Sequence, residues 1–293
     1  MPSLKEVRNR IVSVNSTQQI TKAMKMVAAA KLRRAQDAIT QLRPYSQKLS
    51  GIISNVSSQS DEGFDNPFAE QRQVNNVLIV VITSDRGLCG AFNTNICKAV
   101  TNLLTESYAT QLAAGNVTLL AVGKKGNDYF TKRGLNVDAR FVTQFSDLSF
   151  DKVKLIAEEV MTSFSAGKFD KVELVFNEFR NVALQIIRTE QFLPIVATEN
   201  TNDSKAEVNS IFEPSKVEIL SELLPKSLKI QFYKSLLESN ASEHGARMSA
   251  MDKATENAGE LLKALKLSYN RSRQAAITNE ILEIVGGAEA LAK

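Results

Sequence analysis

The sequence predicts an α/β protein in which helices at the two ends of the chain form a long antiparallel coiled coil beside a central Rossmann-like α/β domain with a mostly parallel sheet. Three observations predict this fold. A hydrophobic repeat with alternating steps of 3 and 4 residues runs through the first 56 residues, the same repeat returns from residue 241, and strand-like runs alternate with helical patterns between them. The predicted boundaries are 1–56 for the first helix, 74–195 for the domain and 211–293 for the last helix, with linkers at 57–73 and 196–210.

The first helix is predicted from its seam and its start. The seam positions are Leu4, Val7, Ile11, Val14, Gln18, Thr21, Lys25, Ala28, Leu32, Ala35, Ile39, Leu42, Ser46, Leu49, Ile53 and Val56. Ser3 and Glu6 form a capping-box pattern, in which each side chain serves a free backbone amide. At about 1.5 Å per residue the helix would be about 80 Å long, so much of it must project from an ordinary domain. Pro44 removes one backbone donor and predicts a bend there.

The last helix follows Pro214 and a second capping-box pattern at Ser215 and Glu218, and Pro225 predicts a kink or a short break. Its seam positions are Ala241, His244, Met248, Met251, Thr255, Ala258, Leu262, Leu265, Tyr269, Ser272 and Ala276. Because each helix alone would expose its seam, we expect the two to pair with each other, in antiparallel orientation. The polar and small seam residues predict a thin, close coil.

Between the helices, the apolar and β-branched runs predict strands at 77–83, 117–122, 137–142, 172–176 and 184–187. Helical patterns separate them at about 92–112, 124–133 and 150–166. Strands that alternate with helices predict a largely parallel sheet. The flanking stretches 57–73 and 197–210 are rich in Ser, Asn, Asp, Glu and Gln, which is typical of loops.

Composition sets ordinary bounds on the protein. The chain has 293 residues, of which 43% are hydrophobic, and a net charge of +4. Its longest purely apolar run, Val77 to Ile82, is far shorter than the roughly 20 residues of a membrane helix, and the amino terminus lacks an apolar signal core. Cys89 and Cys97 are too few to stabilise a fold by disulfide bonds or to build a metal site. We therefore expect a soluble, non-exported protein in a reducing compartment.

The charge is unevenly placed. Residues 1–50 carry ten basic groups against Glu6 and Asp37, a net charge of +8, while residues 241–293 carry seven of each sign. This excess predicts an anionic partner for the amino-terminal helix. Any single one of these charges is equally well explained as part of a solvated helix face, because long cationic side chains often only keep a helix in solution.

Candidate chemistry is sparse. The segment from Ser84 to Asn93 lies between a predicted strand and a predicted helix, where phosphate-binding loops occur, but it matches neither GxGxxG nor GxxxxGK[ST]. The glycines there are better explained by a tight turn. Cys89 as a nucleophile would need a nearby base, and the only histidine, His244, lies in the seam of the distant helix. The sequence therefore predicts no catalytic, cofactor-binding or metal-binding residue.

Three segments of the sequence stand out as motifs. They are the segment from Thr17 to Gln36, the SDRGLCG motif that begins at Ser84, and the segment from Ala241 to the tail, which closes with an ITxExxExxxGAxA pattern from Ile277 to Ala290. Together they resemble the motifs of the gamma subunit of F-type ATP synthases. The resemblance implies a central-stalk rotor without an active site of its own, which couples rotation of the c-ring to conformational changes at the catalytic beta subunits. It implies the alpha, beta and epsilon subunits and the c-ring as partners, no nucleic acid and no cofactor.

The resemblance also implies roles for single residues. Contacts to beta subunits are implied for Lys22, Met24, Arg33, Arg34, Arg273, Gln274 and Thr278. Ile281, Ile284, Val285 and Leu291 match the shaft tip in an apolar sleeve, and Phe212 and Glu213 match a segment that meets the c-ring. Each of these residues is alternatively only a support of its helix. Lys25 departs from the pattern, because many relatives carry a glutamate there. The implied location is peripheral, on the cytoplasmic face of the bacterial inner membrane.

Two other functional classes stay open at this level. A coiled-coil nucleic-acid binder would use the basic segment on phosphates, although residues 1–44 lack aromatic groups for stacking on bases. A nucleotide-dependent enzyme would use the loop 84–93, and it predicts that nucleotide protects the isolated chain.

Overall fold

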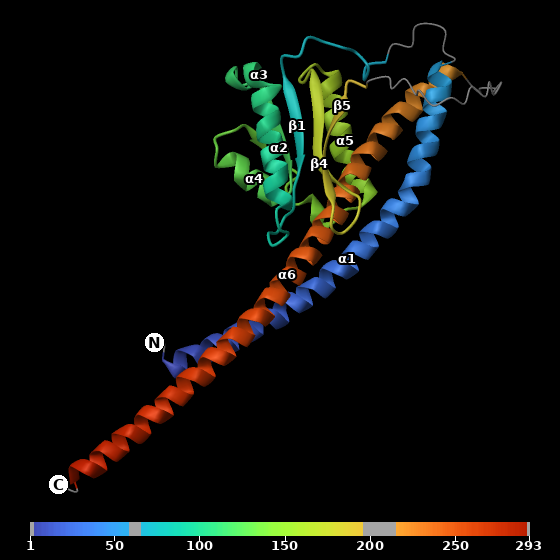
Figure 1. Cartoon of the computed structure of the whole chain (residues 1–293). Helices are drawn as coiled ribbons and strands as arrows, with labels where there is room; N and C mark the ends of the chain where they lie inside the picture. Colours follow the sequence, from blue (N-terminus) through green and yellow to red (C-terminus); the bar gives the residue numbers. More distant parts are fainter. Residues whose placement is uncertain (1–2, 59–65, 196–214, 292–293) are drawn as a thin grey trace. The chain divides into compact units, whose positions relative to one another are not determined.

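The computed structural model describes residues 3–58, 66–195 and 215–291 (Figure 1). The elements in chain order are α1 (Leu4–Ser58), β1 (Val77–Ile82), α2 (Phe92–Glu106), α3 (Ala109–Ala113), β2 (Val117–Val122), α4 (Lys124–Thr131), β3 (Val137–Asp138), the short 3-10 helix η1 (Gln144–Ser146), α5 (Phe150–Ser165), β4 (Lys171–Phe179), β5 (Gln185–Leu193) and α6 (Lys216–Leu291).

The chain forms two compact units, which we describe one at a time. The coil unit comprises Met1–Ala28 and Arg247–Lys293, and the sheet unit comprises Ala29–Ala246. Because α1 and α6 run from one unit into the other, each contributes one part to both.

The sheet unit is built on five strands in the order β3-β2-β1-β4-β5. β1 pairs in parallel with β2 and β4, β2 pairs in parallel with β3, and only β5 runs antiparallel, beside β4. Val77 lies opposite Val117 on one side and Lys171 on the other. All six residues of β1 are buried, as expected for a central parallel strand covered on both faces. The predicted mostly parallel sheet is confirmed.

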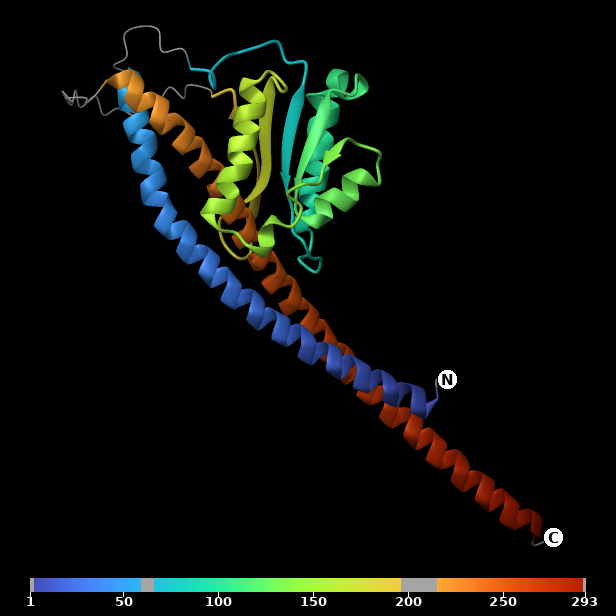
Figure 2. The same cartoon turned by 180° about the vertical axis from the view of Figure 1, so that it is seen from behind.

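Two apolar clusters cover the faces of this sheet. On one face, Leu78, Val80 and Ile82 of β1 pack with residues of α5, while on the other, Val77, Ile79 and Val81 pack with α2. Figures 1 and 2 show α2 and α5 on opposite faces. The cluster on the α5 face also contains Leu228, Phe232 and Leu236 of α6. The first part of α6 therefore belongs to the core of the sheet unit, which the heptad pattern alone did not reveal.

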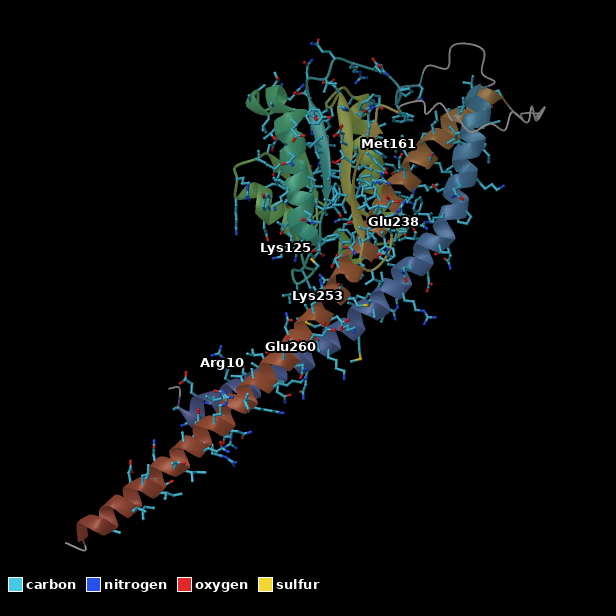
Figure 3. The ribbon with its side chains drawn as sticks, in the orientation of Figure 1. Arg10, Lys125, Met161, Glu238, Lys253 and Glu260 are labelled. Carbon is cyan, nitrogen blue, oxygen red and sulfur yellow. The ribbon has the colours of Figure 1, made fainter. Side chains whose placement is uncertain are left out.

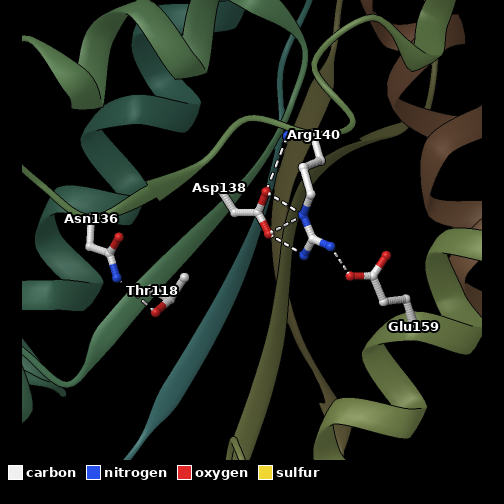
Figure 4. A network of polar contacts seen from close by, with 5 residues as sticks. All are labelled: Thr118, Asn136, Asp138, Arg140 and Glu159. Atoms are coloured by element: carbon white, nitrogen blue, oxygen red, sulfur yellow. Dashed lines mark hydrogen bonds and ion pairs between the residues drawn. The ribbon is translucent and has the colours of Figure 1, made fainter.

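The predicted strand 137–142 is wrong beyond its first two residues, because β3 contains only Val137 and Asp138. The Asp138 carboxylate accepts hydrogen bonds from the backbone N–H of Arg140 (3.1 Å) and from its guanidinium Nε (3.0 Å), which turns the chain away from the sheet (Figure 4). The same guanidinium pairs with Glu159 of α5 and holds the pKa of Asp138 below its usual range. On the same sheet edge, Asn136 donates to the Thr118 hydroxyl at 3.1 Å.

Both long helices continue through their prolines. Pro44 lies inside α1 and Pro225 inside α6, so the alternative of a short break at Pro225 is wrong. Leu224 and Leu228, on either side of Pro225, are buried, and their packing offsets the lost backbone hydrogen bond. The bend at Pro44 stays a prediction. At the helix starts, the amides of Glu6 and Glu218 donate to the hydroxyls of Ser3 and Ser215, both at 3.2 Å, which is half of each predicted capping box.

Candidate functional site

The coil unit pairs the start of α1 with the part of α6 that begins at Arg247. Every predicted seam position of α1 from Leu4 to Ala28, and of α6 from Met248 to Ser272, is buried or partly buried. The pairing is antiparallel, because Gln18 contacts Thr255 whereas Lys25, further along α1, contacts Asp252, earlier on α6. Ala276, which we predicted in the seam, is exposed. The seam ends before it because α1 begins at Leu4 and so offers no residue to pack there.

The end of α6 is bare. From Arg273 to Ala288 every residue is exposed, including the apolar Ile277, Ile281, Leu282, Ile284 and Val285, whose exposed fractions lie between 47% and 67%. In Figure 1 this is the red end of α6. Apolar side chains gathered on an exposed helix mark an interaction surface. This end of α6 is therefore a candidate surface for binding a partner protein.

Within the sheet unit, α1 is held to α6 by a continuation of the seam and by one ion pair. Leu32, Ala35 and Ile39 of α1 are almost completely buried. The Glu238 carboxylate of α6, itself buried, accepts hydrogen bonds from Arg43 of α1 (3.3 Å) and from the backbone N–H of Phe179 at the end of β4 (3.1 Å). Figure 3 labels Glu238 on α6. This carboxylate therefore ties α1, α6 and the sheet together.

The loop after β1 uses its polar groups internally. Ser84 donates its backbone N–H to Asn93 Oδ1 at 3.0 Å, and Asn93 Nδ2 donates to the Ser84 hydroxyl at 2.7 Å. The N–H of Gly126, in the first turn of α4, donates to the Thr83 hydroxyl at 2.8 Å. These donors are not available to cradle a phosphate, which argues against the nucleotide-dependent enzyme.

The two cysteines are buried, and neither forms a disulfide. Burial raises the pKa of the Cys97 thiol to about 11, so this group stays protonated at neutral pH. Cys89 lies 3.2 Å from Asn93 Nδ2, inside the hydrogen-bonded loop. Both thiols therefore have the surroundings of structural cysteines. Among the described residues, no group of three or more histidine, cysteine or acidic side chains is placed to hold a metal ion.

Known proteins are similar to this chain over almost its whole length. A family model described as ATP synthase matches residues 3–291. A relative from Cytophaga hutchinsonii, the ATP synthase gamma chain, is 63% identical over 293 residues and covers 99% of both chains. This chain belongs to the ATP synthase gamma chain family. A family member from Chlorobaculum parvum is 50% identical over 291 residues, again with 99% of each chain covered.

Solved structures have the same fold as this gamma-family chain. A chain of the Tetrahymena thermophila mitochondrial ATP synthase, from a structure of the central stalk and c-ring, matches with a TM-score of 0.55 and 26% identity, and the match covers 80% of this chain and 99% of that one. A chain from the Euglena gracilis mitochondrial enzyme gives a TM-score of 0.66 at 22% identity over 98% of this chain and 94% of that one.

The residues predicted to contact beta subunits are spread over both units. On α1, Lys22 is exposed and Met24 partly buried in the coil unit, whereas Arg33 and Arg34 are exposed in the sheet unit. On α6, Arg273, Gln274 and Thr278 lie within two turns of exposed helix, where the Thr278 hydroxyl donates to the Gln274 carbonyl at 2.9 Å. Their contacts with beta subunits stay predictions.

The predicted tip residues Ile281, Ile284 and Val285 are all exposed on the bare end of α6. Leu291 is the last residue of α6, and its side chain is outside the described residues, as are Phe212 and Glu213. In the described part of the chain, no helix combines the length and the apolar character needed to span a membrane.

Sequence reasoning missed two partners of the seam, Asp252 and Glu238. Both are acidic residues of α6 that pair with basic residues of α1, Lys25 and Arg43. A signal for Glu238 was available, because a lone acidic residue follows the apolar pair Leu236 and Leu237. Asp252 gave no such signal, because its partner is known only once the register of the two helices is known.

Proposed function

We propose that this gamma chain is the central rotor shaft of a proton-translocating F-type ATP synthase. The observation that carries the proposal is the bare apolar end of α6 on a coil that belongs to the gamma family along its whole length. A helix end of this kind needs a sleeve, and a ring of alpha and beta subunits supplies one. Rotation of the c-ring turns the shaft, and the shaft changes the conformations of the beta subunits in turn.

The shaft acts through contacts that differ between the states of a beta subunit, because a ligand shifts a conformational equilibrium only by its differential affinity for the two states. Arg273, Gln274 and Thr278 are suited to a reversible polar latch, since an exposed guanidinium and an exposed amide both form hydrogen bonds without a large packing change. Lys22, Met24, Arg33 and Arg34 serve the same purpose on α1, where the basic excess suits acidic beta-subunit levers.

The sheet unit serves as the collar that links the shaft to the epsilon subunit and to the c-ring, with Phe212 and Glu213 at the c-ring contact. The chain supplies no active site of its own, and the catalytic chemistry belongs to its partners. Its place is peripheral, on the cytoplasmic face of the bacterial inner membrane. We retain the division into an amino-terminal shaft helix (1–56), a central domain (74–195) and a carboxyl-terminal shaft helix (211–293) as part of this proposal.

The test is reconstitution of the catalytic particle. The purified chain is mixed with alpha and beta subunits of the same source, and ATP hydrolysis is measured with the parent chain and with Arg273→Ala/Gln274→Ala. We expect hydrolysis that depends on the chain and that the double change lowers about tenfold, as for the loss of one or two hydrogen bonds to charged groups. Because both side chains are exposed, the double variant should be as stable as the parent.

Arg271→Ala is the matched control, because this arginine is also exposed on α6 but is not among the predicted contacts. It should leave hydrolysis within twofold of the parent. A chain that neither joins the hexamer nor alters its hydrolysis would refute the rotor, whereas a chain that joins with no effect of the double change would refute only the latch.

A further inference from the structure

Three consecutive seam positions of α1 in the coil unit carry polar side chains, namely Gln18, Thr21 and Lys25. The seam positions on either side of them, Val14 and Ala28, are apolar or small. All three polar residues bond to α6. Lys25 Nζ lies 2.5 Å from Asp252 Oδ1, the hydroxyls of Thr21 and Thr255 lie 2.8 Å apart, and Gln18 Nε2 donates to the Thr255 carbonyl at 3.3 Å. We call these six groups on five residues the polar lock.

The hydroxyl groups of the polar lock have local partners as well. The Thr255 hydroxyl lies 2.7 Å from the Met251 carbonyl, and the Thr21 hydroxyl lies 3.0 Å from the Gln18 carbonyl. Each hydroxyl has one proton, so one threonine donates to its own helix while the other donates across the seam. Either arrangement satisfies both groups. Thr21 is only 9% exposed, so without its partner on α6 its hydroxyl would keep only the Gln18 carbonyl of its own helix.

Gly259 gives Gln18 its room. A Cβ atom at position 259 would lie 3.0 Å from Gln18 Nε2, which is closer than nine in ten real contacts of a Cβ atom, so the amide would have to shift. The amide therefore reaches the α6 backbone over a residue without a side chain. This fit depends on one particular alignment of the two helices.

We infer that the polar lock sets the register of the coil and thereby positions the turn of α1 that carries Lys22 and Met24. A slip of one heptad would bring Gly245 or Gly259 opposite Lys25, so its carboxylate partner would be lost. The same slip would place Met248 or Leu262 opposite Thr21, leaving a hydroxyl against an apolar side chain. A single buried polar pair is known to fix register in coiled coils at some cost in stability. The positioning of Lys22 and Met24 as contact residues rests on the proposed rotor function, but the register does not.

The polar lock provides specificity rather than strength. The side chains of Lys25 and Asp252 are 39% and 46% exposed, and exposed ion pairs add little to stability. A seam in which the polar residues are replaced by leucine should therefore be at least as stable as the parent seam, but it should populate more than one register. A merely structural role predicts the opposite, because loss of a stabilising contact lowers the melting temperature.

The test traps the register in the full chain with disulfides. Ile11→Cys/Leu262→Cys continues the spacing of Gln18 and Thr255 by one heptad on each helix and reports the native register, whereas Ile11→Cys/Tyr269→Cys reports a slip of one heptad. Each pair is oxidised in the parent and in Gln18→Leu/Thr21→Leu/Lys25→Leu. We expect the native pair to exceed the slipped pair at least tenfold in the parent, and this ratio to fall at least fivefold in the triple variant with no loss of melting temperature.

Lys31→Leu is the matched control, because this exposed lysine of α1 lies outside the seam, and it should leave the ratio unchanged. A charge exchange gives a second test that needs no apolar change. Lys25→Glu should lower the ratio at least threefold, and Lys25→Glu/Asp252→Lys should restore it to within twofold of the parent. A triple variant that keeps the parent ratio, or a charge exchange that restores nothing, would overturn the inference.

The same charge variants in the reconstituted particle separate this inference from the proposed function. If the positioning is correct, Lys25→Glu lowers hydrolysis and the exchange restores it, while Lys31→Leu has no effect. Should the parent chain fail to stimulate the hexamer, the rotor function fails, yet the disulfide ratios still decide the register. Should the parent stimulate hydrolysis and the exchange fail to restore it, the positioning role is wrong.

Discussion

Glu238 offers the sharpest test of how α1 is attached to the sheet unit. Its carboxylate is buried and joins three elements, because it accepts from Arg43 of α1 and from the Phe179 N–H at the end of β4 while belonging to α6. Two substitutions separate these contacts. Glu238→Ala removes both, whereas Glu238→Gln keeps an oxygen for the Phe179 N–H and removes the charge that faces Arg43.

The magnitude follows from the exposure of each partner. Phe179 is 8% exposed, so its unpaired N–H in Glu238→Ala costs about 1 to 3 kcal/mol. The Arg43 side chain is 51% exposed and returns to water when its partner is removed, so its pairing contributes at most about 1 kcal/mol. We therefore expect Glu238→Ala to lower the free energy of unfolding by about 1 to 4 kcal/mol, and Glu238→Gln by about 1 kcal/mol or less.

The assay is urea unfolding followed by circular dichroism, with the free energy obtained by linear extrapolation. Glu222→Ala is the control, since this glutamate is exposed on the same helix and its removal should change stability by less than about 0.5 kcal/mol. If Glu238→Ala proves no more costly than Glu222→Ala, the carboxylate does not join the three elements. If Glu238→Gln proves as costly as Glu238→Ala, the ion pair and not the Phe179 amide carries the effect.

Three further predictions concern the sheet unit. Phe232 is fully buried and packs edge-on against Phe192, so Phe232→Ala should lower the free energy of unfolding by about 3 to 5 kcal/mol. A loss below about 1 kcal/mol would show that α6 is not part of this core. Gly123→Ala combines a φ of 109° with a Cβ atom 2.1 Å from the Thr83 carbonyl oxygen, so it should be strongly destabilising or prevent folding. Gly115→Ala, at a φ of 75° and with open space around the new Cβ atom, should lower the free energy of unfolding by only about 1 to 2 kcal/mol. Equal losses for the two variants would contradict this reasoning. Burial raises the pKa of Cys97 from 9.0 to about 11, so the unfolded chain loses this proton at lower pH than the folded chain. The free energy of unfolding should therefore fall by up to roughly 2 to 3 kcal/mol as the pH rises from about 9 to 11. Parallel urea titrations of the parent and Cys97→Ala should show this component only in the parent, and identical pH profiles would refute it.

The long-period features of the fold were predictable from the sequence because they repeat. Each seam position from Leu4 to Val56 turned out to be buried or partly buried, since a heptad repeat over so many turns has one geometric solution. The central strands were equally readable, because strands covered on both faces are continuous apolar runs such as Val77 to Ile82.

The features that escaped sequence analysis depend on neighbours that are distant in the chain. The strand at 137–142 stops after Asp138 because a side chain captures the backbone of Arg140, which apolar periodicity does not register. The apolar residues around Phe232 indicated a helix but not that its partner is a sheet. Lys25 was recognised as a departure from the family pattern, and only the register of the coil identified Asp252 as its partner.

The central claim is that this chain turns within a ring of alpha and beta subunits, and the most direct measurement is rotation itself. The parent chain is labelled at Leu184→Cys, an exposed position between β4 and β5, and assembled with an immobilised hexamer, while the native cysteines stay buried. On addition of ATP, we expect the label to rotate in one direction at a rate that follows hydrolysis. A label that stays still while the same particles hydrolyse ATP at the full rate would contradict the account.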